Sequence, residues 1–142
     1  MDGVEGWVLD TSAVEWFAAG KDYAHAVVFE SMRHITPLLV PSTVLALAYA
    51  RIPEPAHHAI DVLMGLPIVD LHDIDKTTAK SIGALLAAPI DKDEAHGLAA
   101  MAAAHTVVAA RVRDWAVISD STAHLHAFEG TKVDVKLLRD DF

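Results

Sequence analysis

Short apolar segments alternate with longer amphipathic segments along the chain, and this alternation constrains the fold more than any other feature. The segments with the length and composition of buried strands are residues 6–9, 38–40, 67–71, 115–119 and 133–138. Between them, apolar residues recur at helical spacing. Strands that alternate with helices are typical of an α/β fold with a mostly parallel sheet.

The helices expected between these strands can be placed from their caps and prolines. The first begins at Thr11 or Ser12, since either hydroxyl can cap it. The later helices are expected over residues 21–34, 42–52, 53–66, 73–88, 91–114 and 121–128. A chain of 142 residues suits one domain, so we expect residues 1–142 to form a single unit.

Charge and composition exclude several classes of protein. The chain has 20 acidic and 11 basic residues, a net charge of −9, whereas phosphate backbones attract Lys and Arg. General nucleic-acid binding is therefore disfavoured, although a local basic strip or a basic protein partner stays open. Cysteine is absent, which fits a reducing cytoplasm. No apolar run approaches the roughly 20 residues of a membrane span, so no membrane association is expected.

Polar residues follow the predicted strands at the points where those strands end. Asp10 follows the first, the pair Pro41–Ser42 follows the second, and Ser119–Asp120–Ser121 follows the strand at 115–119. In open parallel sheets, ligands bind at the carboxyl ends of the strands. A carboxylate at a helix start also caps the helix, so Asp10 can serve as a site residue or as a cap. The same two interpretations apply to Asp120.

Four segments, in this order, resemble the PIN domain, and most nearly the VapC-type toxin ribonucleases. They are VLDTSAV (8–14), LLVPSTVLALAYAR (38–51), LHDIDKTTAKSIGALLA (71–87) and AHTVVAARVRDWAVISDS (104–121). The resemblance implies a three-layer α/β/α fold with a short, mostly parallel sheet of four to five strands. It also implies metal-dependent RNA cleavage, in which three or four carboxylates hold Mg²⁺ or Mn²⁺ and polarise water.

The residues that the resemblance assigns to the site match the family pattern unevenly. Asp10 takes the position of the first acid, and Thr11 and Ser12 match the hydroxyls that follow it. The second acid position falls on Leu47 and the third on Ala103, where neither side chain can bind a cation. Two expected carboxylates are therefore missing.

The end of the strand at 115–119 keeps the family's hydroxyl but shifts its acid. The family pattern is Thr or Ser, one residue, then Asp or Asn, whereas this chain has Ser119–Asp120–Ser121. An alternative register would place Glu94 at the third acid position, but it adds roughly 13 Å of helix at 1.5 Å per residue. His124 and His126 lie two residues apart and do not share a helix face, so no metal site is expected there.

These matches define the candidate site. The candidate catalytic residues are Asp10, Ser119 and Asp120; the candidate binding residues are Thr11, Ser12 and Ser121; the candidate metal ligands are Asp10 and Asp120. With so few acids we expect either weak binding of Mg²⁺ or Mn²⁺ or, as the favoured case, no binding. We therefore expect the melting temperature to change little when either ion is added. By the same reasoning, Asp10→Asn should be near neutral apart from any lost capping.

Two hypotheses follow. In the first, the chain is a catalytically impaired PIN-like protein that dimerises through its helices and binds a protein or RNA partner. In the second, it is an active Mg²⁺- or Mn²⁺-dependent endoribonuclease toxin held inactive by an antitoxin. The missing acids at Leu47 and Ala103 favour the first.

Overall fold

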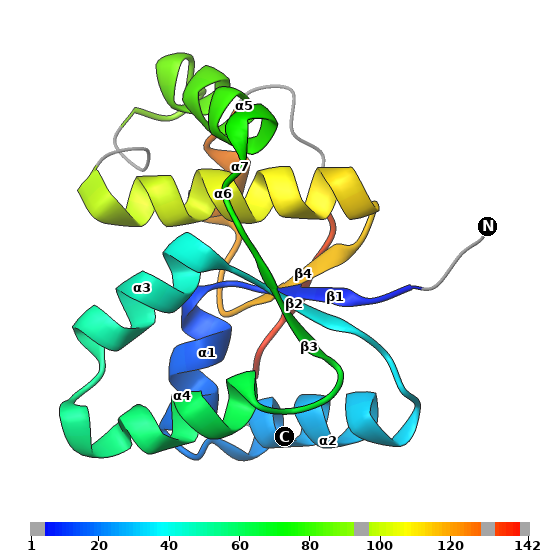
Figure 1. Ribbon diagram of the computed structural model, residues 1–142. Coiled ribbons are helices and arrows are strands. Elements are labelled where there is room, and N and C mark those ends of the chain that lie inside the picture. Colours follow the sequence, from blue (N-terminus) through cyan, green and yellow to red (C-terminus); the bar gives the residue numbers. More distant parts are fainter. Residues whose placement is uncertain (1–4, 93–96, 129–132, 140–142) are drawn as a thin grey trace.

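The computed structural model describes residues 5–92, 97–128 and 133–139, and in this part of the chain five parallel strands form one sheet (Figure 1). The strands are β1 (Trp7–Leu9), β2 (Leu38–Pro41), β3 (Val69–His72), β4 (Ala116–Ser119) and β5 (Val135–Leu137). Their order across the sheet is β3-β2-β1-β4-β5, so β1 lies at the centre. All five expected strands are present, within two residues of the expected bounds.

Helices cover both faces of this sheet. They are α1 (Thr11–Ala18), α2 (Asp22–Arg33), α3 (Ser42–Arg51), α4 (His57–Met64), α5 (Lys76–Ala87), α6 (Gly97–Arg113) and α7 (Ala123–His126), with a 3-10 turn, η1, at Glu54–Ala56. Figure 1 shows α1, α2 and α4 on one face and α5, α6 and α7 on the other, while α3 packs against both α1 and α6. The three-layer α/β/α architecture predicted from the sequence is confirmed.

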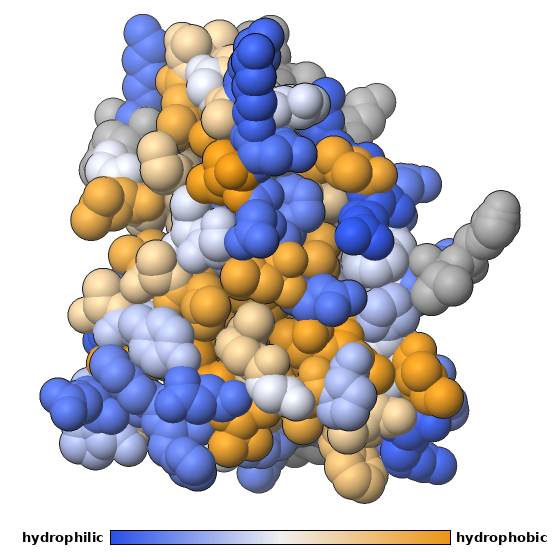
Figure 2. All heavy atoms as spheres, viewed as in Figure 1, coloured by the Kyte–Doolittle hydropathy of each residue, from blue (hydrophilic) through white to orange (hydrophobic). Residues whose placement is uncertain are grey.

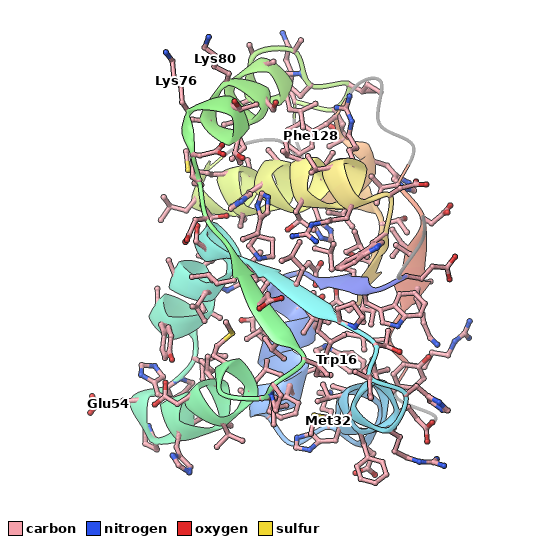
Figure 3. The ribbon with its side chains drawn as sticks, turned by 45° about the vertical axis from the view of Figure 1, so that its right-hand side comes forward. Trp16, Met32, Glu54, Lys76, Lys80 and Phe128 are labelled. Carbon is pink, nitrogen blue, oxygen red and sulfur yellow. The ribbon has the colours of Figure 1, made fainter. Side chains whose placement is uncertain are left out.

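Alternating strand residues supply the two halves of the core, because successive side chains point to opposite faces. The α1 side buries Leu9, Val40 and Ile118, whereas the α6 side buries Val8, Leu39 and Val117. Helix α6 is buried on every side over residues 102–110, and five of these nine residues are alanines, whose small side chains allow close packing. Phe128, fully buried, closes this half of the core beside α6 (Figure 3).

The sequence left three candidate caps for α1, namely Asp10, Thr11 and Ser12. Asp10, and neither Thr11 nor Ser12, is the N-cap, because its backbone is extended (φ −87°, ψ −176°) and its carboxylate accepts from the amide of Ala13. Asp75 caps α5 through Thr78 in the same way. The interpretation of Asp120 as a cap is wrong, since the N-cap of α7 is Thr122.

Two further expectations from the sequence concern the alternative register through Glu94 and the absence of a membrane span. Helix α6 is described from Gly97 onward, so Glu94 and the alternative register that depends on it lie outside the described residues. Within the described ranges, no helix combines the length and apolarity needed to cross a bilayer.

A buried pair of histidines joins α3, α6 and β3. His105, fully buried, contacts Thr43 through Nδ1 (2.8 Å to Oγ1) and His72 through Nε2 (2.9 Å to Nδ1). Burial, with a smaller contribution from His72, lowers the pKa of His105 to about 4. Burial also lowers the pKa of His72, helped by the nearby Arg113.

We therefore predict that stability falls as the pH drops from 6.5 towards 4. In this window both histidines are protonated in the unfolded chain but stay neutral in the folded chain. The free energy of unfolding therefore decreases as the pH falls. The loss should be on the order of 2 kcal/mol. Urea unfolding at a series of pH values measures it, with His105→Asn as a variant whose profile should be flatter. A wild-type profile that is flat over this window, or an unchanged slope in His105→Asn, would contradict the assignment.

Candidate functional site

A cavity of about 340 Å³ opens at the carboxyl end of the sheet, beside the end of β1. It is lined by residues of α1, α3 and α6 and of the segment after β4: Asp10, Thr11, Ser12, Glu15, Leu47, Arg51, Ala99, Ala103, Thr106, Asp120, Ser121 and His124. Since β1 and β4 are adjacent and parallel, Asp10 and the segment after Ser119 lie together at the carboxyl end of the sheet. Both are among the polar residues that follow predicted strands in the sequence.

Asp10 is buried at the base of this cavity and accepts hydrogen bonds on both of its oxygens. Oδ1 accepts from Ser12 Oγ (2.6 Å) and from the amide of Ala13 (3.0 Å). Oδ2 accepts from Ser119 Oγ (2.5 Å) and from His124 Nε2 (2.8 Å). An ionised carboxylate offers about four lone-pair positions and only accepts, so Nε2 must be the donor. The protein therefore fills the hydrogen-bonding capacity of Asp10.

These bonds continue into the segment after β4. His124 Nδ1 lies 3.1 Å from Ser121 Oγ, and the amide of Asp120 donates to Ser12 Oγ (2.9 Å). The amide of Ser121 contacts Ser119 Oγ at 3.3 Å. When His124 is neutral and donates from Nε2, its Nδ1 accepts from the Ser121 hydroxyl. The polar residues after β4 thus form one network centred on Asp10.

The two positions where the resemblance places missing acids are part of the same cavity. Leu47 from α3 and Ala103 from α6 both line it together with Asp10. Their side chains are apolar where a metal ion would need oxygen ligands. An apolar wall also raises the free-energy cost of an ionised side chain beside it.

Five of the residues that line this cavity were not among the candidates predicted from the sequence: Glu15, Arg51, Ala99, Thr106 and His124. His124 was set aside, although the short helix α7 directs its ring to Asp10. Glu15 lies four residues after Thr11, a spacing that puts both on one face of α1 and could have revealed it. Glu15 pairs with Arg51 (3.2 Å to Nε); burial raises its pKa, Arg51 opposes this rise, and Asp10 and Asp120 add to it.

The residues present do not fit a dedicated Mg²⁺ or Mn²⁺ site. Mg²⁺ needs oxygen ligands with free lone pairs. Asp10 has its lone pairs occupied, Glu15 is held by Arg51, and Asp120 is exposed. Within residues 5–92, 97–128 and 133–139, no three side chains among His, Asp and Glu are placed to hold one ion. The catalytic and binding roles assigned to the candidate residues stay predictions.

Comparison with known proteins bears on the fold. No family model matches the sequence, and no curated protein matches it either. Among solved structures, the chain is similar to a chain of VapBC2 from Rickettsia felis bound to a DNA fragment from their promoter, with a TM-score of 0.63 and 10% identity over 94% of this chain and 98% of that one. It is also similar to a chain of DNA-bound VapBC from Salmonella typhimurium, with a TM-score of 0.61 and 14% identity over 93% and 97%. Identities this low establish the fold alone, and the predicted PIN-like fold of the VapC type is confirmed.

The four bonds to Asp10 change the expectation for its replacement. Asp10→Asn presents an amide N–H₂ where Ser119 or His124 now donates, so we predict a loss of about 1–3 kcal/mol of stability, and not the near-neutral effect expected from charge alone. Asp120→Asn is the matched control, because its exposed carboxylate bonds no other described residue and the change should stay within about 0.5 kcal/mol. Chemical denaturation at pH 7 measures both, and equal effects of the two substitutions would contradict the network.

Proposed function

We propose that this chain is a PIN-like protein of the VapC-type ribonuclease lineage whose catalytic site is impaired and which acts by binding a partner. The observation that carries the proposal is the set of four protein donors on Asp10. A cation that bound this carboxylate would have to displace at least one of them. Among these donors, His124 Nε2 takes the place that an ion in the cavity would occupy, because His124 lines the cavity and bonds Oδ2.

The cavity wall supports the same proposal. Family sites hold an ion with several carboxylates, whose mutual repulsion is relieved when the ion binds. Leu47 and Ala103 remove two of those charges, and Arg51 compensates Glu15. The repulsion that would attract a divalent ion is thereby reduced, and with it the chemistry that such an ion supplies, activation of water against a phosphodiester.

A protein partner is favoured over RNA on electrostatic grounds. The chain carries a net charge of −9, which opposes a phosphate backbone and suits a partner with basic residues. The VapBC structures with the same fold are toxin–antitoxin assemblies bound to DNA. We infer an antitoxin-like protein as the partner, with the chain itself as a homodimer.

One observation keeps an active endoribonuclease as the second candidate. Asp10, Glu15 and Asp120 line one cavity, so a substrate phosphate could in principle complete a weak Mg²⁺ or Mn²⁺ site. This candidate requires His124 to leave Asp10 and Arg51 to release Glu15. It therefore predicts cleavage that needs high metal concentrations and that is lost in Asp10→Asn.

A gain-of-function variant tests the proposal. We predict that Leu47→Glu combined with Ala103→Asp will be less stable than the wild type without metal, because carboxylates then gather around Asp10, and will gain a rise in Tm with millimolar Mn²⁺. The wild type should show no such rise and no Mn²⁺-dependent cleavage of RNA. Thermal unfolding with and without Mn²⁺, together with an RNA cleavage assay, provides both measurements.

The matched control is Leu47→Gln combined with Ala103→Asn, which has nearly the same shape without the charges. It should show no rise in Tm with Mn²⁺. The proposal is wrong if the wild type cleaves RNA with Mn²⁺ and Asp10→Asn abolishes that cleavage.

A further inference from the structure

Strand β3 forms an open edge of the sheet. It is the last strand in the order β3-β2-β1-β4-β5 and pairs with β2 alone. Figure 1 views this edge from the front, where no described helix or strand lies over it. Exposed edges are templates for pairing with another chain, and natural proteins protect them with short strands, charged side chains (especially lysine), proline or a bulge. Strand β3 is short and carries one charged residue, Asp70. The four residues of β3, VDLH, contain neither proline nor lysine.

The register with β2 shows which backbone groups of β3 are free. The amide of Leu38 donates to the carbonyl of Ile68, and Leu38 is opposite Val69. Along a strand, the backbone N–H and C=O groups of successive residues point alternately to one side and the other. Asp70 and His72 therefore turn these groups to β2, and Leu71 turns its own outward. No other described residue bonds the backbone N–H or C=O of Leu71. The edge therefore offers one free donor and one free acceptor at its middle residue.

Apolar side chains surround these free groups. Leu71 is 42% exposed, Val62 on α4 is 46% exposed, and Ile74 just beyond β3 is 41% exposed. Figure 2, viewed onto the same edge, shows apolar residues reaching the surface in the middle of this face. The edge thus joins unpaired backbone groups with apolar surface.

The sequence of β3 is complementary to itself about Leu71. If a second copy lies antiparallel with Leu71 opposite Leu71, then Asp70 of each copy lies opposite His72 of the other. His72 bonds His105 through Nδ1, and its Nε2 contacts no described residue at hydrogen-bonding distance. Nε2–H can therefore donate to the Asp70 carboxylate across the pair. Side chains that lie directly opposite each other on paired strands stabilise the pairing when they form hydrogen bonds or carry opposite charges. This complementarity selects a second copy of the chain as the occupant of the edge.

We propose that two copies of this chain associate through β3, antiparallel about a two-fold axis at Leu71, to make one continuous sheet. The inference rests on the homodimer of the proposed function but places its interface on a strand edge and not on the helices. At the axis the amide of Leu71 in each copy donates to the Leu71 carbonyl of the other. The side chains of Leu71 and Val62, both on the α4 face, then meet their counterparts.

The test is the dimer dissociation constant of the full chain and of variants, measured by sedimentation velocity over a range of concentrations. Leu71→Pro removes the outward N–H and leaves the bonds to β2 intact, because proline is tolerated at an edge position whose amide faces solvent. It should raise Kd at least about tenfold, since two symmetric hydrogen bonds are lost. Leu71→Val is the matched control, which keeps both the amide and an apolar side chain and should dimerise as the wild type does.

A second variant and a second readout cover the case in which Leu71→Pro fails to fold. Asp70→Arg, at an exposed position, should raise Kd roughly three- to thirtyfold, because both symmetric pairs with His72 are lost. Phe29→Arg, an exposed residue on α2, should leave Kd unchanged. In the wild type, the Leu71 amide should exchange with solvent more slowly as the protein concentration rises.

The outcomes separate the two claims. A dimer that Leu71→Pro and Asp70→Arg leave intact would overturn the β3 interface while the homodimer of the proposed function stands. A wild type that stays monomeric at all concentrations, with a rapidly exchanging Leu71 amide, would overturn both the homodimer and this interface.

Discussion

The carboxylate of Asp10 is the contact on which the rest of the site depends. It stands at the end of the central strand and joins three elements, since its donors come from the start of α1, the end of β4 and the helix α7. A buried carboxylate is costly unless its charge is hydrogen-bonded, and here each oxygen has two donors. The arrangement of the segment after β4 follows from that requirement, because Ser119 and His124 must both reach one oxygen.

The same contact links stability to the impaired catalysis that we propose. A carboxylate that binds an ion must keep lone pairs free and tolerate repulsion from its neighbours until the ion arrives. In this chain the lone pairs go to hydroxyl, amide and imidazole donors, and Leu47 and Ala103 line the cavity at the two positions where the resemblance expects acids. The hydrogen bonds of Asp10 are thereby satisfied by the protein itself. The proposed function therefore assigns binding to surfaces such as the cavity mouth and the edge of β3.

Much of the fold was accessible from the sequence because parallel strands and their helices leave a strong periodic signal. The strand that ends at Leu9 placed Asp10, and the resemblance placed Leu47 and Ala103 on the cavity that they line. The cap of α1 stayed open among Asp10, Thr11 and Ser12 because all three have capping side chains, and only the extended backbone at Asp10 decides among them. His124 could not be placed, because its approach to Asp10 depends on the path of residues 119–123, which no periodicity encodes.

The most direct measurement of the central claim is calorimetric titration of Mn²⁺ into the wild-type chain and into Asp10→Asn at pH 7. If the four donors satisfy Asp10, the wild type should release or absorb no saturable heat at submillimolar Mn²⁺, and the two proteins should give the same trace. A saturable binding curve with one ion per chain in the wild type, absent from Asp10→Asn, would show that the carboxylate is free for metal and would contradict the account.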